Sequence, residues 1–260
     1  DYEVSLPLDA SPVQFSSWMG GDRDGNPFVT SKVTEQVLLL ARKRAAKLFA
    51  IDLDRLQVEL SMYDCNDALR EKVGDANEPY RALLRPLVDK FIATRDGISD
   101  YLAGKNPDTS NWVESDDELI EPLMLCYQSL LDCGMQVVAN GLLLDTIRRA
   151  RVFGIHLLRL EERQDSECQA DVFSELTRYL GLGDYAQWSE ADKQAFLLRG
   201  LGSKRPLFPA QWDASDDVKE VLDTCKVIAK HSNLGFGIYL ISMARKPSDE
   251  MAVQLLLQES

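Results

Sequence analysis

The sequence predicts a mostly helical fold with a few parallel strands. Most of its 260 residues lie in stretches where apolar side chains recur every three or four positions, as on one face of a helix. Short segments near residues 13–18, 155–163 and 237–243 instead have the patterns of strands. The apolar run in the second segment is typical of a parallel sheet that is covered on both faces.

Composition and charge exclude several classes of protein. The net charge of −13 repels the phosphate backbone of DNA and RNA, so no nucleic-acid partner is expected. No apolar run is long enough to span a bilayer, so no membrane role is expected. Scattered cysteines without metal-binding spacing predict reduced thiols in a cytoplasmic protein. These cysteines are Cys65, Cys126, Cys133, Cys168 and Cys225.

The first predicted strand leads into an unusual loop, Trp18–Pro27, which reads Trp-Met-Gly-Gly-Asp-Arg-Asp-Gly-Asn-Pro. A glycine-rich loop before a helix brings backbone N–H groups close to an anion, and Arg23 adds further donors. The same residue types, with Asp22 and Asp24, also form tight turns in which aspartates bond to their own backbone. The residues themselves leave both interpretations open: the loop is either a binding site or a tight turn that requires glycine and aspartate.

The spacing within this loop excludes three familiar sites. A calcium loop of the EF-hand type needs glycine at its sixth position and glutamate at its twelfth, whereas Gly25 is the fourth residue from Asp22. The loop also lacks the Lys-Ser/Thr ending of a phosphate-binding P-loop and the glycine spacing of a dinucleotide site. No metal or cofactor site is therefore expected from this motif.

Helical patterns fill most of the remaining chain. A long amphipathic helix begins at Thr30-Ser31, and its basic cluster Arg42–Lys47 is interpreted as a solvated or carboxylate-paired face. Residues 103–114 resemble a surface linker. Further helices are predicted over residues 53–60, 79–102, 115–133, 170–180 and 216–230, with a short one within 66–78. Another helix ends near residues 149–151, and two more begin at Ser189 and Ser248. His231 is expected to be exposed, and His156 to be a core or rim residue.

The segment 154–163 carries charged residues beside its apolar run. Periodicity alone allows either a strand or a helix. On a strand, Arg159, Glu161 and Arg163 share one face, whereas Glu162 lies on the other. Charged groups are rarely buried unless they are paired, so these residues form either a ladder of ion pairs or an anion site.

Several strings in register resemble the phosphoenolpyruvate carboxylase family. The loop Trp18–Pro27 carries its signature, and the resemblance covers nearly the whole chain. Five further strings support it in the same order: Glu78–Arg81, Cys126–Leu130, Leu176–Gly181, Ser203–Leu207 and Ile241–Ala244. The resemblance implies that the chain is a central segment, residues 1–260, of a phosphoenolpyruvate-utilising (β/α)8 barrel with large helical insertions.

The resemblance also implies roles for individual residues. The family segment that usually ends Asp-Ile-Arg-Gln-Glu-Ser is here Glu161–Ser166, and Arg163 falls on the arginine that holds phosphoenolpyruvate. Glu162 replaces an apolar residue, which is a departure in local packing. By the same resemblance Trp18 walls the bicarbonate or enolate pocket, and Arg23 with Asp22 or Asp24 shapes its loop. Arg163, Trp18 and Arg23 are thus the expected catalytic residues, with Arg163, Asp22 and Asp24 binding substrate.

For the parent protein, the resemblance implies carboxylation of phosphoenolpyruvate with bicarbonate to oxaloacetate and phosphate. It further implies Mg²⁺ or Mn²⁺, held by residues outside this segment, and a cytoplasmic homotetramer. The family's general-base histidine motif, metal-binding carboxylates and mobile arginine loop are not found in this sequence, so the isolated segment is expected to be inactive. The alternative is a non-enzymatic helical interaction module whose arginines pair with its surplus carboxylates.

Overall fold

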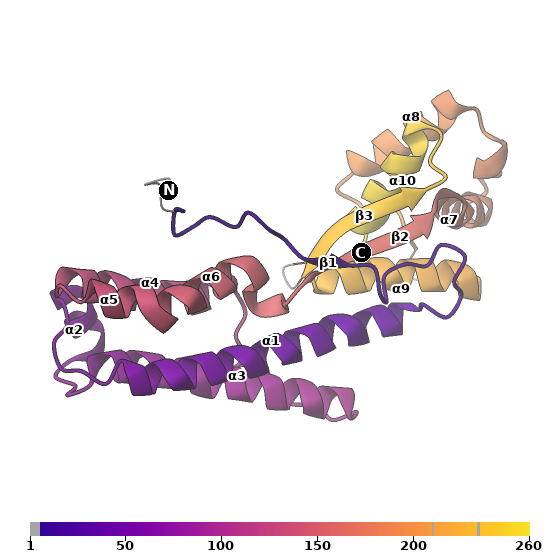
Figure 1. Ribbon diagram of the computed structural model, residues 1–260. Coiled ribbons are helices and arrows are strands. Elements are labelled where there is room, and N and C mark those ends of the chain that lie inside the picture. The colour runs from indigo at the N-terminus through magenta and orange to yellow at the C-terminus, as the bar shows by residue number, and fades with distance from the viewer. Residues whose placement is uncertain (1–5, 210, 233–234) are drawn as a thin grey trace. The chain divides into compact units, whose positions relative to one another are not determined.

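The computed structural model of the chain describes residues 6–209, 211–232 and 235–260 (Figure 1). It divides into two compact units. One, here called the helical unit, comprises Asp1–Phe15 and Leu38–Leu158, and the other, the sheet unit, comprises Ser16–Val37 and Arg159–Ser260. The prediction of a mostly helical fold with a few parallel strands is confirmed. Within the described ranges, no helix combines the length and the apolar character needed to cross a membrane.

The helical unit is built from antiparallel and crossing helices, of which α4 packs against α6 and α2 against α3. A π-helical turn, Ala139–Leu143, joins α5 to α6, and a short 3-10 turn, Gly154–His156, follows α6. The predicted helix 53–60 is not separate, because α1 runs without a break through it. The helices are α1 (Ser31–Glu59, from Leu38 on in this unit), α2 (Asp67–Val73), α3 (Pro79–Leu102), α4 (Asp116–Asp132), α5 (Gln136–Val138) and α6 (Leu144–Phe153).

Capping explains where several of these helices begin. Asn66 accepts a hydrogen bond from the N–H of Leu69 at the start of α2, and Ser115 accepts one from Glu118 at the start of α4. Proline stands at the first position of α3, where its missing N–H costs nothing. The predicted start at Ser115 and the predicted bounds of α3 are confirmed.

Two predictions for the helical unit hold only in part. Residues 103–111 are irregular and mostly exposed, and Arg44 and Lys47 are solvated. Within the expected surface linker 103–114, Trp112 and Val113 are buried, and Trp112 packs in a cluster with Leu39 and Ile98. The basic face of α1 is not wholly solvated, because the Arg42 side chain is buried. Its guanidinium donates to the carbonyl oxygen of Val113 and lies 5.3 Å from the centre of the Trp112 ring.

The sheet unit holds three parallel strands in the order β1-β2-β3, with β1 at Ser16–Ser17, β2 at Arg159–Asp165 and β3 at Phe236–Ser242. The predicted strand 13–18 is reduced to two paired residues. Phe15, before them, stacks on Phe153 within the helical unit. After them the chain turns, since the N–H groups of Gly21 and Asp22 both bond to the carbonyl of Trp18.

The second strand starts four residues later than predicted. Gly154 has a positive φ of 53°, and the N–H of Ile155 donates to the carboxylate of Asp116 at 2.7 Å, so the chain turns there. His156 lies beside the same carboxylate, 3.6 Å away. The apolar run that predicted a strand from residue 155 is therefore partly a turn packed into the helical unit, with Ile155 buried.

Helices of the sheet unit surround a second core, in which Phe173 contacts Tyr185 and Phe196. In Figure 1 α10, coloured yellow, lies beside α8, and it also contacts α7 and α9. Helix α7 begins four residues before its predicted start, because Asp165 caps it by accepting from the N–H of Glu167. These elements are α7 (Ser166–Tyr179), the 3-10 turn Tyr185–Gln187, α8 (Glu190–Leu201), α9 (Asp216–Lys230) and α10 (Pro247–Gln258).

His231, at the end of α9, is buried rather than exposed. Its Nε2 lies 3.1 Å from Oε1 of Glu35, and Lys230 donates to the same oxygen at 2.7 Å. The residue expected to be exposed thus lies at a packed helix end, where Lys230 and His231 meet a carboxylate on the first turns of α1.

Candidate functional site

The loop Trp18–Pro27 lies along β2 and continues the parallel pairing of the sheet. The N–H of Arg23 donates to the carbonyl of Arg163 at 2.9 Å, and the N–H of Arg163 donates to the carbonyl of Gly21 at 2.9 Å. Asp22 and Arg163 accordingly form an isolated parallel bridge. The loop is therefore held in strand-like register beside β2, which makes its side chains alternate between two faces.

On one face the structure brings together Arg163, Asp22 and Asp24. The guanidinium of Arg163 lies 3.1 Å from Oδ2 of Asp24 and 3.9 Å from Oδ2 of Asp22. The Arg163 side chain is 46% exposed, so donors of its planar fork remain accessible from solvent. The cluster stands two residues before the carboxyl end of β2, the end at which parallel sheets carry binding sites.

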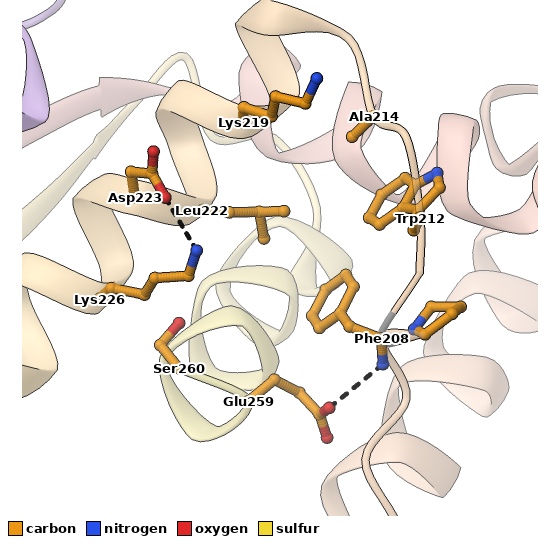
Figure 2. A pocket seen from close by; sticks show the side chains of 10 residues that line it. Phe208, Trp212, Ala214, Lys219, Leu222, Asp223, Lys226, Glu259 and Ser260 are labelled. Carbon is orange, nitrogen blue, oxygen red and sulfur yellow. Dashed lines mark hydrogen bonds and ion pairs between the residues drawn. The ribbon is translucent and has the colours of Figure 1, made fainter.

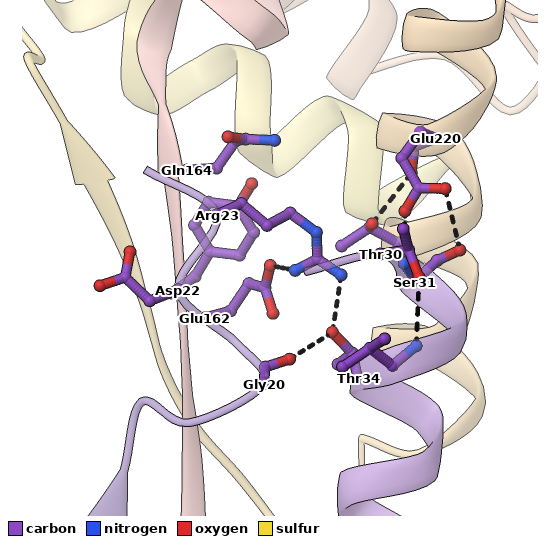
Figure 3. Close-up of polar contacts among 12 residues, drawn as sticks. Gly20, Asp22, Arg23, Thr30, Ser31, Thr34, Glu162, Gln164 and Glu220 are labelled. Atoms are coloured by element: carbon purple, nitrogen blue, oxygen red, sulfur yellow. Dashed lines mark hydrogen bonds and ion pairs between the residues drawn. The ribbon is translucent and has the colours of Figure 1, made fainter. Parts of the chain in front are cut away.

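Arg23 lies on the opposite face and does not join this cluster. Figure 3 shows its guanidinium directed at Glu162 and Thr34, with the Asp22 carboxylate on the other side of β2. Arg23 donates to Oγ1 of Thr34 at 2.6 Å, and Thr34 donates in turn to the carbonyl of Gly20 at 2.6 Å. Burial lowers the pKa of Arg23, against the opposing effect of the Glu220 carboxylate.

The ion-pair partner of Arg23 is Glu162, a contact not predicted from the sequence. Its side chain is 1% exposed and forms an ion pair with the equally buried guanidinium of Arg23. The strand alternation does predict that Glu162 faces away from Arg163. Nothing in the sequence pattern indicates that the loop places an arginine against it, because that contact depends on the register of loop and strand.

Trp18 stands at the entrance of the loop. Its carbonyl anchors the turn, accepting from the N–H groups of Gly21 and Asp22 at 3.0 Å each. Its side chain is largely exposed.

Glu220 holds the start of α1, beside the same loop. Its carboxylate accepts hydrogen bonds from both the N–H and the hydroxyl of Ser31, as Figure 3 shows. The sequence predicts the Thr30-Ser31 start of the helix but not this partner, which lies 189 residues away in the chain. A cavity of about 290 Å³ adjoins this region. It is lined by Arg23, Asn26, Gln164, Cys168, Asp171, Asp217 and Glu220, among others.

A second pocket of the sheet unit, of about 280 Å³, is drawn in Figure 2. Phe208 and Trp212 stack on its wall with ring centres 5.8 Å apart. Both of its lysines are already in ion pairs, Lys219 with Asp213 at 3.0 Å and Lys226 with Asp223 at 2.8 Å. The pocket is therefore mainly an apolar depression, and it does not include any of the expected site residues.

The described ranges contain no group of three or more histidine, cysteine, aspartate or glutamate side chains that could hold a metal ion. Asp22 and Asp24 face a guanidinium instead. The residues described do not by themselves fit a metal site.

Parallel strands, with a half-exposed arginine beside two carboxylates near the carboxyl end of the central one, define a mostly helical α/β protein with a polar cluster at the edge of its sheet. The family profile described as phosphoenolpyruvate carboxylase matches residues 1–260. The chain belongs to the phosphoenolpyruvate carboxylase family.

Curated relatives agree with this assignment. The chain is 58% identical over 257 residues to a phosphoenolpyruvate carboxylase of Aeromonas hydrophila, covering 99% of this chain and 29% of the relative. It is 53% identical over 259 residues to the enzyme of Tolumonas auensis and 55% identical over 262 residues to that of Vibrio vulnificus, each covering 100% of this chain and 30% of the relative. The chain thus spans less than a third of the length of these relatives.

Proposed function

We propose that the protein to which this chain belongs is a phosphoenolpyruvate carboxylase that converts phosphoenolpyruvate and bicarbonate to oxaloacetate and phosphate. The observation that carries the proposal is the Arg163 cluster, an exposed guanidinium oriented by two carboxylates near the carboxyl end of a parallel strand. Family membership and the identity to carboxylases of three genera support it.

Arg163 has the chemistry to bind the phosphate of phosphoenolpyruvate. A planar guanidinium can donate two parallel hydrogen bonds to a phosphate or carboxylate. Asp22 and Asp24 hold one edge of the guanidinium. A substrate anion would take the exposed edge, so that the carboxylates fix the direction in which the cation points.

The reaction needs positive charge at the transferred phosphoryl group. In the proposed sequence bicarbonate attacks the phosphorus, giving carboxyphosphate and the enolate of pyruvate, and the enolate then captures carbon dioxide released with phosphate. Arg163 would stabilise charge on the phosphoryl oxygens, as such transfers require. Trp18 would wall the bicarbonate or enolate pocket and exclude water, while Arg23 would shape the loop from its buried side.

The remaining catalytic parts are proposed to come from elsewhere in the parent protein. Mg²⁺ or Mn²⁺ would polarise the substrate when bound. The ligands of this ion would lie outside the described residues, because these hold no cluster of metal-binding side chains. The three parallel strands would form part of a (β/α)8 barrel. We further propose a cytoplasmic homotetramer, as the family resemblance implies.

The test is bicarbonate-dependent oxaloacetate formation by the full-length parent, followed through NADH oxidation by added malate dehydrogenase. Arg163→Ala is expected to lower kcat/KM by about 10³-fold, a loss typical of removing one transition-state donor. The isolated 260-residue chain is expected to form no oxaloacetate. A parent without activity in either Mg²⁺ or Mn²⁺ would favour the non-enzymatic interaction module, in which Arg163 only pairs with Asp22 and Asp24.

A further inference from the structure

Adjacent residues of β2 serve opposite faces of the same loop. Arg163 meets Asp22 and Asp24 on one face, and Glu162 meets Arg23 on the other. Arg23 lies between Asp22 and Asp24 in the chain. The face toward which the Arg23 side chain points therefore determines the face toward which both aspartate side chains point. If Arg23 turned outward, the alternation of a strand would carry both aspartates away from Arg163.

The inward direction of Arg23 is secured by charge and by hydrogen bonding. The side chains of Arg23 and Glu162 are 4% and 1% exposed, and a buried charge without its partner is strongly unfavourable. Thr34 is fully buried and links the Arg23 guanidinium to the carbonyl of Gly20. One hydroxyl thereby fixes both the side chain of Arg23 and the backbone at the start of the loop.

Among the described residues, no carboxylate other than Glu162 forms an ion pair with Arg23. Glu220, whose charge acts on Arg23, already accepts two hydrogen bonds from Ser31. A hydrocarbon side chain at position 162 would neither accept a hydrogen bond nor balance the charge of Arg23. Glu162 is therefore the carboxylate that balances the buried charge of Arg23 in direct contact.

We propose that Glu162 and Thr34 are positioning residues for the Arg163 site. They act through Arg23, holding residues 20–24 in the register that directs Asp22 and Asp24 onto the Arg163 guanidinium. The inference rests on the proposed function, because the consequence of lost positioning is weaker binding of phosphoenolpyruvate. Neither side chain would touch the substrate, since each lies on the face of β2 opposite Arg163.

The experiment uses the full-length parent protein and three variants. Glu162→Gln keeps the shape of the side chain and removes its charge. Thr34→Val keeps the shape and removes the hydroxyl. Glu167→Gln is the matched control, because it removes a carboxylate from the exposed surface of α7 close by in sequence.

Two quantities are measured, amide hydrogen exchange in the peptide covering residues 18–27 and the KM for phosphoenolpyruvate against kcat. Exchange at the loop amides is expected to rise about tenfold or more in Glu162→Gln and Thr34→Val, and KM about tenfold, with a smaller change in kcat. Glu167→Gln is expected to match wild type in both measurements.

The positioning role is overturned if both test variants keep wild-type exchange in residues 18–27, or if they only lower the melting temperature while KM stays unchanged. Should Glu162→Gln fail to fold, Thr34→Val alone decides the outcome by the same two measurements. A wild-type parent that forms no oxaloacetate would defeat the proposed function, whereas the exchange measurement would still decide whether Glu162 and Thr34 hold the loop.

Discussion

Gly21 lies directly against the main-chain carbonyl of Glu161. A Cβ atom at position 21 would overlap that carbonyl oxygen and stand 3.3 Å from Cγ of Leu160. Both neighbours belong to β2, which is paired on both sides and cannot shift without breaking its ladders. The loop therefore approaches the strand as closely as its backbone allows, and only glycine permits this at position 21.

Gly21→Ala is expected to push the loop away from β2 and to break the bonds that join Gly21 and Arg23 to Arg163. Hydrogen exchange in residues 18–27 should rise, and kcat/KM of the parent should fall by about 10²-fold because the site geometry moves. Gly25→Ala is the matched control. At Gly25 a Cβ meets nothing within 4 Å, so only its positive φ of 69° is strained, at a cost of about 1 kcal/mol. Equal effects of the two substitutions would contradict the close approach.

Arg42 is expected to stabilise the helical unit, although the sequence pattern places it among the exposed basic residues of α1. Arg42→Met removes the hydrogen bond to the carbonyl of Val113 and the contact with the Trp112 ring. The expected loss is about 1–3 kcal/mol of unfolding free energy, because the buried carbonyl loses a charged donor. Arg44→Met, at an exposed position of the same helix, should change stability by about 0.5 kcal/mol at most. Urea unfolding of the two variants gives the comparison.

Local signals allowed much of the helical structure to be predicted. Ser115 caps α4 and Pro79 opens α3 because these effects act within one helical turn. The 3.6-residue apolar period likewise located α9 at its observed bounds, residues 216–230. Such elements depend on their own residues and require no knowledge of the rest of the fold.

Contacts between distant segments could not be predicted in the same way. An apolar run near residue 155 satisfies both a strand and a packed turn, and only the bond from Ile155 to Asp116 decides between them. The Arg23–Glu162 pair depends on the register of a loop against a strand far along the chain. The family resemblance nevertheless selected Asp22, Asp24 and Arg163, which the structure brings into one cluster.

Ser248, in the first turn of α10, is hydrogen-bonded to Glu190 of α8, and loss of the Ser248 hydroxyl should weaken the packing of α10 on α8. Its N–H and hydroxyl donate to the two carboxylate oxygens of Glu190, at 3.0 and 2.8 Å. Ser248 is 2% exposed, so water cannot replace the lost hydroxyl. Ser248→Ala is expected to cost about 1 kcal/mol, and Ser232→Ala, at an exposed position, close to nothing. Thermal unfolding and hydrogen exchange in α10 report the difference, and an equal response of the two variants would refute it.

Glu35 should make the stability of the sheet unit depend on pH. Burial raises the pKa of its carboxyl group, but the hydrogen bonds and charges of Lys230 and His231 outweigh burial and hold it below the ordinary value of 4.5. A carboxyl group with a lowered pKa in the folded state contributes stability above its unfolded pKa and loses it as the pH falls through the folded value. Glu35→Gln should therefore melt about 2 °C below wild type near neutral pH.

The same comparison at acidic pH gives the decisive result. Below the folded pKa of Glu35 the wild-type carboxyl group is protonated and no longer attracts Lys230, so the two proteins should melt at nearly equal temperatures. Glu167→Gln, which removes an exposed carboxylate, should show no such convergence. A difference between Glu35→Gln and wild type that persists unchanged to the lowest pH at which both proteins remain folded would show that the glutamate acts through packing rather than through its charge.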